Sequence, residues 1–354
     1  MQLPRRLSFQ INPIIIREVR TRMRGARPYV ILTAFLMLLM LAGLGIYQLM
    51  LQQARFGAVL LSAQVGQALF KGLAFFELFL IVVLAPALTS SAISGERERL
   101  TYDMLLATPL RPGQLLWGKL IAALSYLLLL IFAAVPIFSV VLVFGGIDPQ
   151  SLLKTMALLL ATTITFGAIG LFCSALLRQS SRATIVSYVL VLVVIGVPTL
   201  IASVWGQFST PQGQNPPPWL IYLNPFSALI SITTISPPTD GGAMPFFGYG
   251  DPLSALPFFN QLTPGVIWYG PMGAEVLPIY RGTLVGYGLL VTVLIWISSH
   301  LALPARRWRP RWSDVAFGLA LVLLLAAAWY SRSWWYVEIP AQLQPPFMVE
   351  PAKG

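Results

Sequence analysis

Charged residues are scarce in this chain of 354 residues, which contains one cysteine and one histidine. Lysine, arginine, aspartate and glutamate together make up 10% of the sequence, whereas soluble globular proteins have about 25%. This scarcity excludes an ordinary soluble protein. Cys173 and His300 alone cannot form a disulfide framework or a typical zinc site. Each lies in a predicted membrane helix, where we expect it only to pack.

Apolar residues make up 57% of the chain, and several charge-free runs reach the roughly 20 residues that cross a bilayer as a helix. The sequence therefore predicts an all-α polytopic membrane protein with about seven transmembrane helices. The first run follows a basic segment, as in a signal peptide, but it is longer than the usual core of about 7–15 residues, and no small-residue cleavage site follows it. The predicted spans are 29–50, 72–93, 114–144, 152–177, 184–205, 282–303 and 314–330.

Lysine and arginine set the expected orientation, because cytoplasmic segments of membrane proteins carry an excess of both. With the N-terminus in the cytoplasm, 17 of the 23 basic residues lie on the cytoplasmic side, and the tail 331–354 lies outside. A net charge of +11 is also typical of nucleic-acid-binding proteins. Here the basic residues flank the apolar runs, so we expect them to contact membrane lipid, with no nucleic acid as a partner.

The segment 206–281, between the fifth and sixth spans, is predicted to lie outside. It has 13 prolines and three acidic residues, and it is too apolar for a disordered linker. Within it, residues 219–235 form an apolar run that Asn224-Pro225 interrupts, because the residue before a proline avoids the helical conformation. A full span here would also turn the basic cluster at 306–311 outward. We therefore predict two short re-entrant or interfacial pieces in a partly buried lid.

The residues before the first span, "INPIIIREVRTRMRGARP", combine an apolar and a basic face. At about 100° per residue, the apolar side chains Ile15, Ile16, Val19 and Met23 share one arc. The adjacent arc is basic and contains Arg17, Arg20, Arg24 and Arg27. This pattern is typical of a helix that lies in the headgroup plane, and we interpret 8–28 in this way. The alternative is a basic tail that only serves the orientation bias.

The predicted cytoplasmic loop between the second and third spans, 94–113, is the most informative stretch. Five charges lie within eight residues, at Glu96, Arg97, Glu98, Arg99 and Asp103. An apolar stripe recurs at helical spacing, at Ile93, Leu100, Met104 and Ala107. Pro109 disfavours helix at Thr108. The pattern predicts a short amphipathic helix that projects from the membrane and docks on a cytoplasmic partner.

Three residues that follow, Gly113, Gly118 and Lys119, match the phosphate-binding pattern G-x-x-x-x-G-K-[ST]. Leu120 stands where a Ser or Thr would reach a magnesium ion, and the intervening Gln-Leu-Leu-Trp is mostly bulky and apolar. The stretch also lies between an amphipathic helix and a membrane span, whereas the pattern joins a strand to a helix. We therefore expect no nucleotide site, and we expect Arg111 and Lys119 to mark the cytoplasmic edge of the third span.

The loop "ISGERERLTYDMLLATPLRPGQLLWGKL" resembles the signature loop of ABC-2-type transporter permeases. Its charged start matches at Glu96, Arg97 and Glu98. The remaining matches are Thr101, Leu105, Leu106, Thr108, Pro109, Gly118 and Lys119. Departures from the usual Gly, Leu and Glu occur at Leu100, Tyr102 and Asp103. The N-terminal helix is similar to the elbow helix of such permeases, and 206–281 resembles their outer re-entrant region, whereas a seventh span departs from the usual six.

The resemblance implies a permease subunit of the cytoplasmic membrane with no catalytic, cofactor-binding or metal-binding residues of its own. A separate ABC ATPase subunit would bind ATP and magnesium and dock on the cytoplasmic loop. A second permease chain, identical or related, would complete the path, and substrate is usually exported. The implied docking residues are Glu96, Arg97, Glu98, Arg99, Leu100, Thr101, Asp103, Met104, Leu105, Thr108 and Pro109.

On this interpretation the chain divides into five parts. These are an elbow helix at 8–28, five spans with the coupling loop at 29–205, an outer re-entrant region at 206–281, two spans at 282–330, and an outer tail at 331–354.

Glu77 is the clear ionisable residue within a predicted span. It lies about five residues from the outer end of the second span, or about 7–8 Å deep at 1.5 Å per residue. A carboxylate inside the membrane is costly and marks a candidate substrate path or gate. The alternative is a carboxylate that is hydrogen-bonded to a neighbouring helix or reaches the outer interface.

Two other functions remain open. A non-transporting membrane scaffold that anchors an ATPase or another complex would need the same docking loop. A secondary transporter tends to have several intramembrane charges and internal repeats, and this sequence shows one clear charge and no convincing repeat. An enzyme acting on lipid is less well supported, because the sequence shows no paired carboxylates or histidine and cysteine arrangement for the chemistry.

Overall fold

A computed structural model describes residues 25–55, 62–100, 112–208, 216–234, 262, 264–270, 273–301 and 312–337. The long helices are α2 (Arg27–Arg55), α3 (Ser62–Thr89), α6 (Pro112–Val143), α7 (Pro149–Leu176), α8 (Ser180–Phe208), α11 (Ile279–Leu301) and α12 (Trp312–Tyr330). The short elements are α4 (Ser94–Glu98), the 3-10 helix η1 (Pro218–Ile221), α9 (Pro225–Thr233), α13 (Arg332–Trp335), and the strands β1 (Ile267–Gly270) and β2 (Gly273–Val276).

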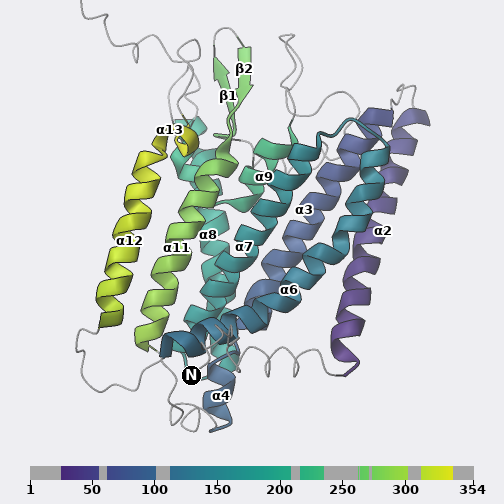
Figure 1. The fold of residues 1–354 in the computed structure, drawn as a ribbon. Coiled ribbons are helices and arrows are strands. Elements are labelled where there is room, and N and C mark those ends of the chain that lie inside the picture. Colours follow the sequence, from purple (N-terminus) through teal and green to yellow (C-terminus); the bar gives the residue numbers. More distant parts are fainter. Residues whose placement is uncertain are drawn as a thin grey trace, which may run out of the picture.

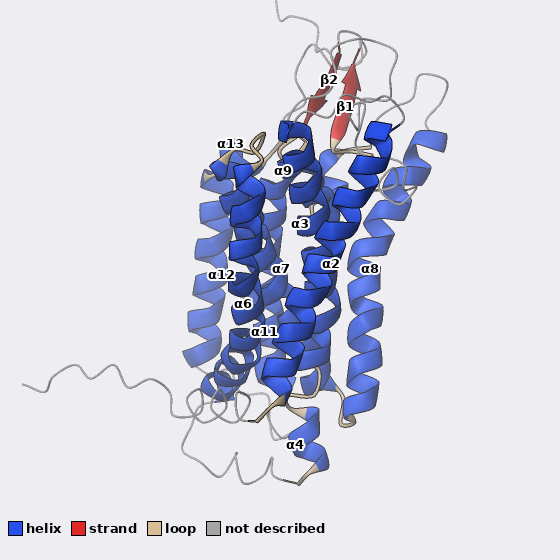
Figure 2. Cartoon of the chain, turned by 90° about the vertical axis from the view of Figure 1, so that its right-hand side faces the viewer, coloured by secondary structure: helices blue, strands red, loops and turns tan. Residues whose placement is uncertain are grey.

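The long helices lie side by side in one bundle, with α4 beyond one end and the β1–β2 hairpin beyond the other (Figures 1 and 2). Among the described residues, six helices are long and apolar enough to cross a membrane: α2, α3, α6, α7, α8 and α11. The expected all-α polytopic membrane fold is thereby confirmed.

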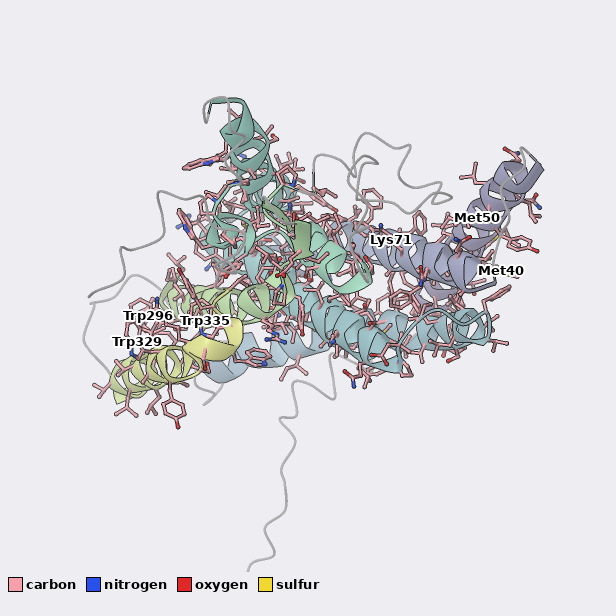
Figure 3. All side chains as sticks on the ribbon, turned by 90° about the horizontal axis from the view of Figure 1, so that it is seen from above. Met40, Met50, Lys71, Trp296, Trp329 and Trp335 are labelled. Atoms are coloured by element: carbon pink, nitrogen blue, oxygen red, sulfur yellow. The ribbon has the colours of Figure 1, made fainter. Side chains whose placement is uncertain are left out.

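The seventh helix, α12, is shorter, with an apolar stretch over Phe317–Tyr330. It runs antiparallel to α11 from end to end. Near one end Trp296 of α11 stacks on Phe317 of α12, with ring centroids 5.2 Å apart. Near the other end Arg281 of α11 donates at 3.2 Å to the carbonyl oxygen of Trp334 in α13, the short helix that directly follows α12. Viewed along the bundle, α12 with Trp329 and α2 with Met40 lie at opposite edges (Figure 3).

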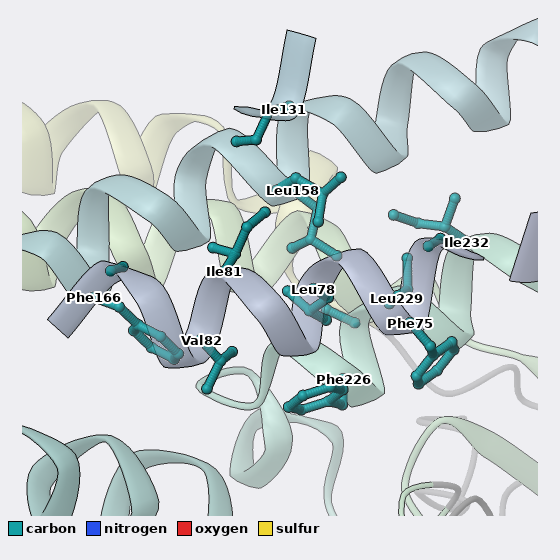
Figure 4. Packing of buried hydrophobic residues seen from close by; sticks show 14 of the residues in the cluster. Phe75, Leu78, Ile81, Val82, Ile131, Leu158, Phe166, Phe226, Leu229 and Ile232 are labelled. Carbon is teal, nitrogen blue, oxygen red and sulfur yellow. The ribbon is translucent and has the colours of Figure 1, made fainter. Parts of the chain in front are cut away.

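Helices α3 and α7 form the centre of the bundle. Their most apolar windows are 72% and 67% buried, against 17% for α2 and 22% for α8. Side chains of α3 such as Leu78 and Ile81 pack among Leu158 of α7 and Phe226 of α9 (Figure 4). The outer helices expose most of their apolar side chains, as expected where lipid replaces water as the solvent.

Two prolines begin helices beside polar caps. Asp148 accepts a hydrogen bond from the Gln150 amide at 3.2 Å ahead of α7. Asn224 accepts from the Phe226 amide at 2.9 Å ahead of α9. Its own amide group donates to the Thr199 hydroxyl of α8 at 2.6 Å. These are N-terminal caps, and the predicted break at Asn224-Pro225 between two short pieces is confirmed.

The β1–β2 hairpin was not predicted from the sequence. Its strands pair antiparallel, with Ile267 opposite Val276 and Gly270 opposite Gly273. The ladder is extended by the Leu277 amide, which donates to the Val266 carbonyl oxygen at 2.8 Å. Val266, Ile267 and Leu277 are buried, so the base of the hairpin is anchored in the core.

Helix α3 begins ten residues before the predicted start of the second span. The residues between α6 and α7 lie against this additional first part of α3. Gly146, at φ +79°, lies so close to Ala63 that a Cβ atom would be 2.5 Å from the Ala63 carbonyl oxygen. Gln67 donates to the Gly146 carbonyl oxygen at 2.9 Å. Lys71, on the same part of α3, is 6% exposed.

The tightest approach in the centre is between α3 and α7. A Cβ atom at Gly170 would lie 2.0 Å from the Thr89 hydroxyl oxygen and 3.3 Å from the Cα atom of Pro86. Thr89 is fully buried and donates to the Ala85 carbonyl oxygen at 2.8 Å, so it has little room to move away. Small residues allow membrane helices to approach closely in this way.

We expect Gly170→Ala to destabilise the protein by about 1–3 kcal/mol, because it overpacks this contact. The measurement is the midpoint of thermal unfolding in a fixed detergent. Gly196→Ala in α8 is the matched control, since nothing lies within 4 Å of its added Cβ atom and alanine favours helix. Equal midpoints for the two variants would contradict the tight α3–α7 contact.

Candidate functional site

The candidate site is the turn and short helix that follow α3. Its first anchor is Ser174 of α7, whose hydroxyl accepts the amide N–H groups of Ile93 at 2.8 Å and Ser94 at 3.0 Å. The Ser94 hydroxyl donates to the Ser90 carbonyl oxygen at 3.0 Å, and Ser94 is fully buried. These bonds satisfy backbone groups that the end of one helix and the start of the next leave unpaired. The start of α4 is therefore fixed to α7.

The second anchor is an ion pair between Glu96 of α4 and Lys119 of α6. Lys119 is 1% exposed, and its ammonium group also donates to the Ala92 carbonyl oxygen at 3.0 Å. The sequence placed Lys119 at the cytoplasmic edge of the membrane. Its side chain is buried within the protein, where a charge is tolerated because it is paired and hydrogen-bonded.

The next two residues extend the same set of contacts. Arg97 donates to the carbonyl oxygen of Ala175 in α7 at 2.9 Å and to that of Leu301 in α11 at 3.4 Å. Glu98 accepts from the amide of Ser180 at 2.8 Å and from its hydroxyl at 2.7 Å. Ser180 is the first residue of α8, where a carboxylate also interacts favourably with the helix dipole.

Three successive charged residues thus connect α4 to the ends of four long helices. Glu96 contacts α6, Arg97 contacts α7 and α11, and Glu98 contacts α8. We call this set of contacts the α4 clamp. Sequence reasoning had assigned these charges to the contact with a partner. The structure shows that each of the three is engaged within the chain.

The predicted helix is shorter than its apolar stripe suggested. Helix α4 ends at Glu98, and Leu100 adopts a positive φ of 59°, which interrupts the helical spacing. Ile93 is fully buried and Leu100 is 81% exposed, so these two residues do not share one face. The prediction of a continuous stripe to Ala107 is therefore wrong at Leu100. Arg99 is exposed.

Several predicted site residues lie outside the described residues. They are Thr101, Asp103, Met104, Leu105, Thr108, Pro109, and the elbow arginines Arg17, Arg20 and Arg24. Arg27 is the first residue of α2. The stretch that resembles a phosphate-binding loop does not form a loop, since residues 112–119 belong to α6.

Glu77 lies deeper than the sequence suggested. Because α3 starts at Ser62, Glu77 is fifteen residues into the helix, or about 22 Å at 1.5 Å per residue. It is 0% exposed, and neither carboxylate oxygen has a hydrogen-bond partner in the structure as described. Both alternatives, a bond to a neighbouring helix and an approach to the outer interface, are therefore wrong.

The direction that Glu77 faces follows from its helical position. Phe70 precedes it by seven residues, about two turns, and so lies on the same side of α3. Phe70 packs edge-on against Phe138 of α6, with ring centroids 5.8 Å apart. Glu77 is therefore on the side of α3 that faces α6.

Sequence reasoning missed Ser174 and Ser180. Ser180 begins a helix, and serine at such a position is a recognisable capping signal. Ser174 lies near the end of an apolar helix, and no local pattern distinguishes it from a packing serine.

The chain is similar to a known protein family and to a bacterial membrane protein. A family model described as "ABC-2 family transporter protein" matches residues 12–328, a range that begins before α2 and ends within α12. The protein described as "Uncharacterized membrane protein YdbK" from Bacillus subtilis (strain 168) is 29% identical over 144 residues. The aligned part covers 36% of this chain and 57% of YdbK, so the chain spans a little over half the length of that relative.

The ion pair between Lys119 and Glu96 can be tested by a double-mutant cycle. We expect Lys119→Met to destabilise the protein by about 3 kcal/mol, because it leaves the Glu96 carboxylate without its cation. Adding Glu96→Gln should recover part of this loss, since the neutral amide needs no counter-ion. Thermal unfolding of the two single variants and the double variant measures the coupling free energy. Additive single effects would show that the pair contributes no coupling.

Proposed function

Because the chain belongs to the ABC-2 family of transporter proteins, we propose that it is the membrane-spanning permease subunit of an ATP-driven exporter. A separate ABC ATPase subunit, which binds ATP and magnesium, docks on α4 and the loop that follows it. A second permease chain, identical or related, completes the path. The chain lies in the cytoplasmic membrane with the α4 end in the cytoplasm, an orientation that the distribution of lysine and arginine supports.

The α4 clamp is the observation that carries this proposal. A helix that only anchored a partner would need one firm attachment to the membrane domain. Helix α4 instead contacts the ends of α6, α7, α8 and α11 through side chains of three successive residues. A displacement of α4 is thus applied to four long helices at once, which is the arrangement that coupling to a moving partner requires.

In this proposal Glu77 is part of the substrate path or of its gate. A fully buried carboxyl group without a hydrogen-bond partner is costly in an apolar interior, and no packing role needs it. The side of α3 that bears Glu77 faces α6, and α6 is tied to α4 through Lys119. In the proposed cycle, movement of α6 relative to α3 exposes Glu77 to the transport path.

The experiment that tests the proposal is purification of the chain in mild detergent, with co-purifying proteins identified by mass spectrometry. We expect an ABC ATPase subunit in stoichiometric amount, and ATP hydrolysis by the complex in proteoliposomes that is altered by Lys119→Met. A complex that hydrolyses ATP but moves no substrate would identify a scaffold. Recovery of the chain without an ATPase subunit would favour a secondary transporter and would overturn the proposal.

The role of Glu77 is tested by cysteine accessibility, for which the chain is well suited because Cys173 is buried. In a Cys173→Ala background, we expect Glu77→Cys to react at least about tenfold faster with a small water-soluble thiol reagent during ATP hydrolysis than at rest. Thr155→Cys is the matched control, since Thr155 is also fully buried and its hydroxyl has no hydrogen-bond partner in the described part of the chain. Equal, ATP-independent rates at both positions would remove Glu77 from the path.

A further inference from the structure

The contact between α3 and α6 combines a carboxyl group with apolar and aromatic side chains. Glu77 of α3 is fully buried, and neither of its carboxylate oxygens has a hydrogen-bond partner in the described part of the chain. We propose that the transported substrate is a monovalent organic cation with an apolar body, and that Glu77 binds its charge. This inference rests on the proposed function and names the class of substrate that uses the path.

The basic residues of the described helices around Glu77 lie away from it. Lys71 precedes Glu77 by six residues, which places it about 9 Å along α3 and about 240° around the helix. Lys154 of α7 lies over the ring of Tyr280, 5.9 Å from its centroid, and Lys119 of α6 is paired with another carboxylate. The apolar stretches of α2 and α9 have no charged residue. Because an ionised carboxylate in an apolar interior needs a cation, a bound substrate is the source that we infer.

The side chains around Glu77 at the α3–α6 contact are apolar. Two turns before it, Phe70 packs edge-on against Phe138 of α6, and Ala74 lies between the two positions on the same side of α3. Helices α3 and α6 run antiparallel (Figure 1), so Ile131, seven residues before Phe138, lies near the level of Glu77. Ala74 and Ile131 are buried in the apolar core. One carboxyl group is thus set in an otherwise apolar contact.

These surroundings favour an organic cation over a metal ion. A hard metal ion needs several oxygen ligands, and the described residues contain no group of three His, Cys, Asp or Glu side chains that could hold one. An organic cation needs one carboxylate for its charge and apolar contacts for its body. The rings of Phe70 and Phe138 offer such contacts about 10 Å further along α3. A neutral substrate would not need so costly a group, and an anion would be repelled by it.

Two ions of the same shape and opposite charge test this substrate class. The complex of the chain with its co-purifying ATPase subunit is reconstituted in proteoliposomes and titrated with tetraphenylphosphonium or with tetraphenylborate. We expect the tetraphenylphosphonium cation to stimulate ATP hydrolysis with a saturable dependence on its concentration, and we expect no stimulation by the tetraphenylborate anion. Equal responses to the two ions, or no response to the cation, would overturn the substrate class.

Substitution of Glu77 tests whether its carboxylate binds the cation. Glu77→Gln should raise the tetraphenylphosphonium concentration for half-maximal stimulation about tenfold or more, because removing one partner of a buried charge pair is costly. Glu77→Asp keeps the charge and should recover part of the affinity. Glu275→Gln is the matched control, because it removes a carboxylate from strand β2, beyond the end of the bundle. Its half-maximal concentration should equal that of the unaltered chain.

Thermal unfolding separates a binding role of Glu77 from a structural one. Glu77→Gln should unfold at the same or a higher temperature than the unaltered chain, because a neutral amide costs less to bury than a charge. An unchanged half-maximal concentration for Glu77→Gln, whatever its stability, would overturn the binding role and leave the proposed function intact. Absence of a co-purifying ATPase subunit would overturn both.

Discussion

The ion pair between Lys119 and Glu96 is the contact on which one end of this bundle depends. Lys119 belongs to a helix that crosses the membrane, and Glu96 belongs to a short helix beyond the bundle. Each would be costly to bury alone. Once paired, they fix where α3 ends and where α6 begins relative to it. Ser174 completes the arrangement by satisfying the amide groups of the turn between α3 and α4.

The sequence was sufficient for features that depend on local chemistry. Apolar length predicts a transmembrane helix because an unpaired backbone group cannot remain in hydrocarbon, and each predicted span corresponds to a described helix. The break at Asn224-Pro225 was predictable for the same reason, since proline restricts the residue before it and asparagine caps the helix that follows. Both constraints act within a few residues of the chain.

The sequence was insufficient where a polar residue finds its partner far along the chain. Gln67 and Lys71 lower the hydropathy at the start of α3, so the predicted span began too late and Glu77 was placed too near the surface. In the structure Gln67 bonds to Gly146, 79 residues away. The charges of α4 show the same limit, because spacing cannot reveal whether Glu96 and Glu98 meet a partner or their own chain. The four-residue strands of the hairpin are too short to produce a clear alternating pattern.

The rigidity of the centre determines how a movement at α4 can reach Glu77. Gly170 brings α7 against Thr89 and Pro86 of α3, so α3 and α7 cannot separate without losing a close-packed contact and are expected to move together. Helix α6 is held differently, by Lys119 at one end and by the contact of Phe70 with Phe138 towards the other. Glu77 lies on the side of α3 between these two attachments. A rotation of α4 that acts on α6 through Lys119 would change the α3–α6 contact at the level of this carboxyl group. The ion pair between Lys119 and Glu96 and the buried carboxyl group of Glu77 are thus two ends of one proposed mechanical connection through α6.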